Sequence, residues 1–206
     1  VAGAVRHPLN ASDFSSFLLQ AQSSKAQILG LANAGGDFTN AMKAAKEFGI
    51  NKTMKIAGLL VFINDVHSLG LANTEGLQLA DSWYWNQDDA SRAFAKRFFE
   101  KYKRMPSSLQ AADYSAATTY LKAVKAAGTT DADKVMAEMK KTGASDFYSK
   151  GKIRADGRMI HDMYLFQVKG SKESATPWDY YKTIAKVPGD QAFTTVAESK
   201  CSLIKK

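Results

Sequence analysis

Two groups of small and polar residues follow apolar runs in the first third of the chain, and their side chains are suited to holding a small molecule. The first group follows the apolar run 28–31, and the second group lies at the end of the apolar run 56–63 and just after it. The candidate residues are Asn33, Ala34, Gly35 and Asp37 in the first group, and Phe62, Asn64, Asp65 and His67 in the second. Amide, carboxylate and imidazole groups beside an apolar wall are typical of a ligand pocket.

These residue types leave alternatives open. A metal site at His67 would need three or four ligands, and Asp37 is the only nearby candidate, so we expect no metal there. Asn64 and Asp65 have a second interpretation, in which they only cap the next helix or turn.

The elements around both groups form a predicted β-α-β unit. Residues 28–31 are a short strand, Asp37 is expected to cap a helix, and Gly49 ends that helix. Residues 56–63 are a nearly continuous apolar run, typical of a strand covered on both faces. Because ligands of open α/β sheets bind at the carboxyl ends of the strands, both groups should face one crevice.

Two aromatic residues farther along the chain are further candidates. Trp85 closes an aromatic run, Trp83 to Trp85, at the end of an expected strand over 76–85. Tyr114 begins a helix predicted over 110–127. Each could line the same crevice or pack in the core.

The remaining pattern indicates an α/β fold. We expect a strand over 1–5, helices over 14–23, 88–102 and 130–142, a linker at 104–108, a hairpin joining 152–154 to 161–168 through an Asp-Gly turn, and a strand over 178–185. The helix over 110–127 should turn Tyr114, Ala117, Leu121 and Val124 inward.

Composition and motifs narrow the function classes. The net charge is +8, but the densest basic group, between Lys96 and Arg104, reads as the solvated face of a helix, so no nucleic acid is expected. We find no nucleophile elbow, phosphate loop, dinucleotide fingerprint or zinc-protease motif, which argues against an enzyme. His7 and His161 are expected to be structural, and the single cysteine, Cys201, could pair only outside this chain.

The order of motifs resembles the periplasmic substrate-binding proteins of branched-chain-amino-acid-type ABC transporters. The resemblance covers almost the whole chain. It is carried by residues 1–5 with 13–16, by 33–37 before a helix ending at 47–49, by 64–67, by 114–116, by 153–159 and by 178–181.

The resemblance implies a lobe with a mostly parallel sheet flanked by helices, a helix pair that crosses to the other lobe, and returning antiparallel strands. Residues 1–104 would form most of the second lobe, 105–158 the hinge crossover and first-lobe helices, and 159–206 the return to the second lobe. The partners implied are a small-molecule ligand, a membrane permease, and either a missing upstream lobe or a second copy of this chain that covers the helix pair. The compartment implied is the periplasm, and no cofactor is implied.

The resemblance also bears on the ligand. Amino-acid binders of this family use an aromatic residue in the loop that here holds Ala34 and Gly35, and a carboxylate where this chain has residues 59–61. A member of the family that binds aromatic carboxylates fits this departure better. The alternatives are a ligand-sensing receptor domain of the same fold, which an adjoining membrane helix would reveal, and an α/β enzyme, which a turnover assay would reveal.

Overall fold

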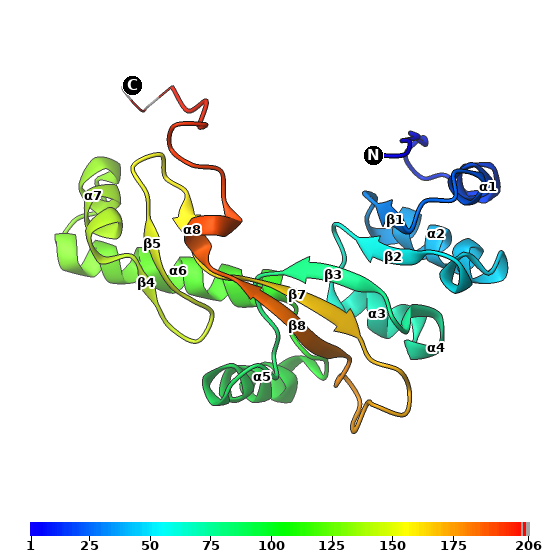
Figure 1. Ribbon diagram of the computed structural model, residues 1–206. Coiled ribbons are helices and arrows are strands. Elements are labelled where there is room, and N and C mark those ends of the chain that lie inside the picture. The colour runs from blue at the N-terminus through cyan, green and yellow to red at the C-terminus, as the bar shows by residue number, and fades with distance from the viewer. Residues whose placement is uncertain (203, 205–206) are drawn as a thin grey trace. The chain divides into compact units, whose positions relative to one another are not determined.

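The computed structural model describes residues 1–202 and 204, and it divides into two compact units (Figure 1). Unit 1 comprises Val1–Ala80 and Leu165–Ile184, and unit 2 comprises Asp81–Tyr164 and the chain from Ala185 onward. The chain therefore passes between the units three times. Each unit is described by itself below.

A five-stranded sheet, most of which belongs to unit 1, has the order β1 (Ile28–Leu31), β2 (Lys55–Gly58), β3 (Gln78–Asp81), β7 (Met163–Val168) and β8 (Tyr181–Val187). β1 pairs with β2 in parallel, Leu31 opposite Gly58, and β2 pairs with β3 in parallel. The predicted β-α-β unit and the mostly parallel α/β sheet are confirmed.

The helices of unit 1 are α1 (Ser15–Ser23), α2 (Gly35–Glu47), α3 (Ile63–Leu69) and α4 (Leu71–Thr74), with a 3-10 turn, η1 (Ile50–Lys52). The apolar face predicted for α2 is buried, with Phe38, Ala41, Met42 and Ala45 in the core. Gly49 has a φ of 67°, a left-handed conformation that glycine adopts easily, and it ends the helix as expected.

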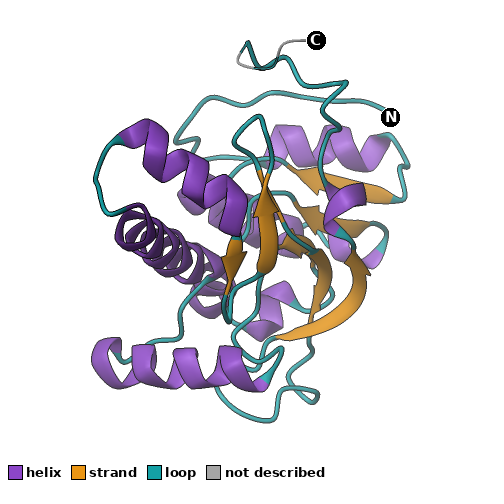
Figure 2. Cartoon of the chain, turned by 90° about the vertical axis from the view of Figure 1, so that its left-hand side faces the viewer, coloured by secondary structure: helices purple, strands orange, loops and turns teal. Residues whose placement is uncertain are grey.

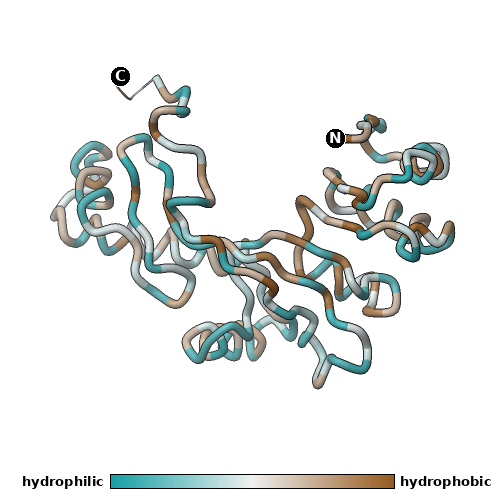
Figure 3. Tube along the Cα trace, viewed as in Figure 1, coloured by the Kyte–Doolittle hydropathy of each residue, from teal (hydrophilic) through white to brown (hydrophobic). Residues whose placement is uncertain are grey.

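Three predictions in this part of the chain were wrong. Residues 1–5 form no strand, because no strand in the described part of the chain pairs with them. β2 ends at Gly58, and its apolar run continues through a turn into α3, which Figure 3 shows as a hydrophobic stretch. β3 ends at Asp81, so Trp83 to Trp85 lie beyond it.

Unit 2 contains α5 (Asp89–Tyr102), α6 (Ser108–Ala127), α7 (Ala132–Thr142), α8 (Gly189–Ala192) and a small sheet of β4 (Ala144–Ser145), β5 (Lys150–Ile153) and β6 (Met159–Ile160). The helix predicted over 88–102 is confirmed as α5, and the Asp88 carboxylate caps it by accepting from Ser91 N. The Asp-Gly hairpin is confirmed, but its second strand is β6, and β7 belongs to the other sheet. The helix predicted over 130–142 is confirmed as α7, which is capped by Asp131, whose carboxylate accepts from Lys134 N.

The buried face of α6 differs from the predicted one. α6 and α7 pack side by side (Figures 1 and 2), and α6 buries Ala111, Ser115, Thr119 and Ala123. Ala111 packs against Trp83 and Phe94, so this face is buried although its side chains are small and less apolar. Tyr114 is exposed, and Leu121 is 63% exposed.

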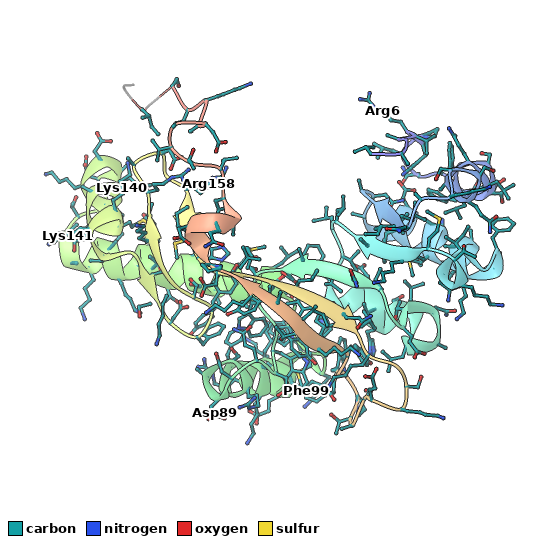
Figure 4. All side chains as sticks on the ribbon, viewed as in Figure 1. Arg6, Asp89, Phe99, Lys140, Lys141 and Arg158 are labelled. Atoms are coloured by element: carbon teal, nitrogen blue, oxygen red, sulfur yellow. The ribbon has the colours of Figure 1, made fainter. Side chains whose placement is uncertain are left out.

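The surface of α5 is as predicted. The basic residues from Lys96 to Arg104 are exposed, and the opposite face buries Phe94 and Ala95. Asp89 and Phe99 mark the outer side of this helix, and Lys140, Lys141 and Arg158 lie elsewhere on unit 2 (Figure 4). In the described part of the chain, no helix combines the length and apolar character needed to cross a membrane.

Candidate functional site

The carboxyl end of β1 leads directly into the first turn of α2. Ala34 is extended, and Gly35 starts the helix with a φ of 56°. Among the described residues, no side chain caps this helix, so the first backbone N–H groups point out of its end. A Cβ built on Gly35 or Gly36 would meet no atom within 4 Å, so the space beside this helix end is open.

Asn33 and Asp37 are engaged with the segment that precedes α1. The Asp37 carboxylate, which is buried, accepts a hydrogen bond from Asn10 N at 3.1 Å. The Asn33 side-chain amide lies 3.3 Å from Nε2 of His7. The predicted helix-capping role of Asp37 was therefore wrong, because the residue sits inside the first turn and its carboxylate is held by another segment.

The carboxyl end of β2 lies beside this loop. Leu59 N donates to Leu31 O at 3.0 Å, and Phe38 of α2 approaches Gly58. Leu59 is 63% exposed, and Leu60 is also exposed. The exposure of this apolar pair differs from the sequence prediction, which places both residues inside a strand over 56–63.

Asp65 caps α3. Its Oδ2 accepts from Phe62 N at 2.9 Å, which fixes the turn that brings the chain from β2 into the helix. Burial raises the pKa of the Asp65 carboxyl group, and the hydrogen bond from Phe62 partly opposes that shift. Asn64 Oδ1 is buried and has no hydrogen-bond partner in the described part of the chain.

His67 lies one turn farther along α3 and contacts the loop before β8. Its ring stacks on Trp178 with centroids 3.7 Å apart, and Nδ1 lies 2.8 Å from the Tyr180 hydroxyl. Trp178 has a φ of 72°, which costs a non-glycine residue energy that the surrounding contacts must offset. The contacts of His67 thus hold a strained loop in place.

Replacing His67 by alanine should lower the free energy of unfolding by about 1–2 kcal/mol, through loss of the ring stack and the hydrogen bond. Urea titration followed by tryptophan fluorescence would measure this, with the exposed neighbour Ser68→Ala as the control. An unchanged midpoint for His67→Ala would show that the stack contributes nothing.

Trp85 and Tyr114 belong to unit 2, where both join one aromatic cluster. Trp85 packs against the buried group of Trp83, Phe94 and Ala111. The Tyr114 ring lies 5.2 Å from that of Phe94. Unit 1 thus brings together Asn33, Ala34, Gly35 and Asp37 with Phe62, Asn64 and Asp65 at one sheet edge, while Trp85 and Tyr114 come together in unit 2.

Among residues 1–202 and 204, no three His, Cys, Asp or Glu side chains gather closely enough to bind a metal ion. The candidate site lies at the carboxyl ends of β1 and β2. It consists of the backbone N–H groups of the first turn of α2, asparagine side-chain amides and the exposed leucines. Its chemistry suits binding of an anionic or partly apolar molecule.

Comparisons with known proteins agree with the fold. The periplasmic binding protein profile matches residues 1–174. A crystal structure of a periplasmic binding protein from Burkholderia mallei is 72% identical, with a TM-score of 0.92, over 98% of this chain and 54% of that one. A branched-chain amino acid ABC transporter ligand-binding protein from Burkholderia xenovorans is 44% identical, with a TM-score of 0.89, over 98% of this chain and 55% of that one.

A solute-binding protein from Rhodopseudomonas palustris, solved in complex with 4-hydroxybenzoate, shares the fold at 20% identity and a TM-score of 0.75, over 92% of this chain and 52% of that one. No curated protein matches the chain. The chain spans about half the length of the solved relatives. The resemblance found in the sequence is confirmed, and the family is one of non-enzymatic binding proteins. With its profile matched over most of its length and a relative at 72% identity, this chain belongs to the periplasmic binding protein family.

Proposed function

We propose that this chain forms about half of an extracytoplasmic solute-binding protein of an ABC importer, which binds a small amino-acid-like or aromatic carboxylate ligand between two lobes. The proposal rests on one observation at the carboxyl ends of β1 and β2: the uncapped first turn of α2 lies beside the exposed residues Leu59 and Leu60. In this family the importing machinery contains a membrane permease, and the compartment is the periplasm; neither a cofactor nor nucleic acid is required.

The helix end favours a carboxylate. The free N–H groups of the first turn and the helix dipole together stabilise a negative charge. Gly35 and Gly36 carry no side chain that would block the approach of a ligand to these groups.

Both carboxylates near this site, Asp37 and Asp65, are already hydrogen-bonded to backbone N–H groups. This favours a ligand that has a carboxylate but no amino group. Asp65 accepts from Phe62 N, and Asp37 accepts from Asn10 N. An ammonium group buried here would lack a free counter-charge from either residue, which is costly. Exposed leucines instead suit a flat apolar ring, and the Rhodopseudomonas palustris relative was solved with such a ligand.

Exposed apolar residues of α6 support an interlobe arrangement. Leu121 is 63% exposed and its neighbour Tyr120 is also exposed, and exposed apolar side chains on a helix normally pack against another element. We propose that the upstream half, and not a second copy, covers them. The boundaries expected at 104/105 and 158/159 differ from the unit boundaries at 80/81 and 164/165, so the assignment of units to lobes belongs to this proposal.

The test uses a chimera in which this chain replaces the matching part of the Burkholderia mallei relative. Calorimetric titration should show binding of 4-hydroxybenzoate and at least tenfold weaker binding of leucine. Tighter binding of leucine would contradict the aromatic-acid preference, and binding of neither would contradict the proposed ligand class.

A matched pair of glycine variants locates the site. Gly36→Glu places a negative charge in the first turn of α2 and should weaken 4-hydroxybenzoate binding at least tenfold. Gly3→Glu adds the same charge in the open segment before α1 and should leave affinity unchanged. Equal effects of the two variants would place the ligand elsewhere.

A further inference from the structure

The first passage of the chain between the two units ends at a buried carboxyl group. The unit boundary lies at 80/81, so Asp81 is both the last residue of β3 and the first residue of unit 2. Only 7% of this residue is exposed. The backbone N–H of Ser82 donates to Asp81 Oδ1 at 2.7 Å, and the Ser82 hydroxyl donates to the same oxygen at 3.4 Å. Asp81 is no part of the candidate site, so its burial needs another explanation.

The start of a helix and a loop of unit 2 close over this carboxyl group. The hydroxyl of Ser108, in the first turn of α6, donates a hydrogen bond to it. Tyr148, in the loop between β4 and β5, donates its hydroxyl proton to Ser82 Oγ at 2.9 Å. Asp81 therefore ties together three segments of unit 2, which are the chain just after the crossing, the start of α6 and the loop 146–149.

A polar cavity gives Asp81 a route to protons from the solvent. The cavity has a volume of about 180 Å³, and both Ser82 and Tyr148 line it. Tyr148 is hydrogen-bonded to Ser82, and Ser82 is hydrogen-bonded to Asp81, so these side chains form a path that leads inward from the cavity. A proton can therefore reach the buried carboxyl group while the protein stays folded.

No cation balances a negative charge on Asp81. In the part of the chain that the structure describes, no ion pair includes this residue. From α6 it faces the uncharged Ser108, and from the loop it faces Tyr148, with Asp146 beyond. Burial, together with the charges of Asp81 and Asp146, raises the pKa of Tyr148, so the phenol stays neutral. Burial also raises the pKa of Asp81 to about 6, because only hydrogen bonds offset its desolvation.

We propose that Asp81 is a proton-dependent latch on the first crossing of the chain. The protonated carboxyl group keeps the segment 81–83 packed on α6 and on the loop 146–149, where Trp83 contacts Ala111 and Phe147. Loss of the proton lets this segment open, because an ionised carboxylate gains hydration in water and the neutral acid gains little. Since the segment joins the two units, the proton sets how freely the chain moves at this crossing.

Hydrogen exchange of the 206-residue chain, without any ligand, tests the latch. The probes are the backbone N–H of Ser82 and the indole N–H of Trp83, which donates to Ser91 Oγ at 2.9 Å. After correction for the intrinsic exchange rate, the protection of both groups should fall about 100-fold between pH 4 and pH 6. This factor follows from a pKa of Asp81 that is 3.8 in the open segment and about 6 in the closed one.

A reference amide separates local opening from unfolding of the whole protein. Val135 is buried in α7, in the same unit, and its backbone N–H donates to Asp131 O at 3.0 Å. Opening of the segment 81–83 leaves that hydrogen bond intact. The Val135 amide should therefore stay at least tenfold better protected than both probes at pH 7.

Two pairs of variants assign the effect to Asp81. Asp81→Asn cannot ionise, so it should keep the protection of the acidic form up to pH 7, while Asp113→Asn, an exposed carboxylate of α6, should behave as the parent. Ser108→Ala removes a hydrogen bond that favours the ionised carboxylate, so the fall in protection should extend to higher pH. Ser115→Ala, at a buried serine of the same helix, should leave the pH range unchanged.

Three outcomes would overturn the latch. The protection of both probes could be independent of pH, or Asp81→Asn could keep the parental fall. Both probes could also exchange at the rate of the Val135 amide at every pH, which would mean that the segment opens only when the protein unfolds. Failure of the chimera to bind 4-hydroxybenzoate would contradict the proposed function and would leave all these expectations unchanged.

Discussion

Replacing Asp81 by asparagine should remove most of the decline in stability between pH 4 and pH 6. Asp81 ends β3 and is only 7% exposed. Burial raises the pKa of its carboxyl group from 3.8 to about 6, although hydrogen bonds from Ser108 and Ser82 oppose the shift. Ser82 N donates to Oδ1 at 2.7 Å, and the Tyr148 hydroxyl donates to Ser82 Oγ at 2.9 Å.

The sign of this pH dependence follows from how many protons Asp81 binds in the folded and in the unfolded chain. Below pH 4 the carboxyl group is protonated in the folded and the unfolded chain, so it adds no pH dependence. Between pH 4 and pH 6 the unfolded chain loses this proton while the folded chain keeps it, so stability falls as pH rises. Above pH 6 the loss is complete and amounts to about 3 kcal/mol.

Asparagine cannot ionise but still accepts one hydrogen bond, so Asp81→Asn should be about 2 kcal/mol more stable than the parent at pH 7. Urea titrations at pH 4, 5, 6 and 7 would measure the slope. Asp113→Asn, an exposed carboxylate of α6 in the same unit, is the charge-matched control. If both variants keep the parental slope, Asp81 is not the group that titrates.

The loss of folding stability at acid pH has a different cause and occurs over a lower pH range. Asp156 is paired with Arg154, which lowers the pKa of that carboxyl group to about 2. Its contribution is present above pH 4 and is lost as pH falls toward 2. Measurements above pH 4 therefore avoid the titration of Asp156, and the raised pKa of Asp65 accounts for part of any decline that Asp81→Asn leaves.

The sequence predicted the β-α-β unit because its signals are local. The run 28–31, the α2 face from Phe38 to Ala45 and Gly49 each depend on periodicity or backbone conformation within one element. The sheet edge that carries the candidate site follows from this unit, since parallel strands place their carboxyl ends together.

Predictions that depend on distant neighbours were less successful. The apolar run 56–63 does not reveal that the chain leaves the sheet after Gly58. Aspartate is a common helix cap, but the carboxylate of Asp37 accepts its hydrogen bond from the backbone N–H of Asn10, which lies in another segment. On α6, hydropathy favours the stripe of Tyr114 and Leu121, but the structure buries the opposite, smaller residues, among them Ala111, which packs against Trp83 and Phe94. His67 is placed by Trp178 and Tyr180, more than 100 positions away in the sequence.

Gly58→Ala should lower the free energy of unfolding by about 2 kcal/mol, because the position has no room for a methyl group. Gly58 is the last residue of β2 and lies opposite Leu31. An added Cβ would fall well inside contact distance of Val61 Cγ2 and 3.5 Å from Phe38. Val61 is buried and β-branched, so it cannot turn aside easily.

The matched control lies on the neighbouring strand. Gly30→Ala adds the same methyl group to β1, where no atom lies within 4 Å, and should be nearly neutral in the isolated chain. The double variant Gly58→Ala with Val61→Ala should be less destabilised than the sum of its parts by about 1 kcal/mol, which a double-mutant cycle in urea would measure.

The same substitution connects packing to the candidate site. Val61 lies between Leu60 and Phe62, so moving it displaces the turn that presents the exposed leucines beside the first turn of α2. In the chimera, Gly58→Ala should therefore weaken 4-hydroxybenzoate binding, and Gly30→Ala should not. If Gly58→Ala costs no more stability than Gly30→Ala, the contact with Val61 does not restrict this turn, and the rigid presentation of the site by β2 would have to be abandoned.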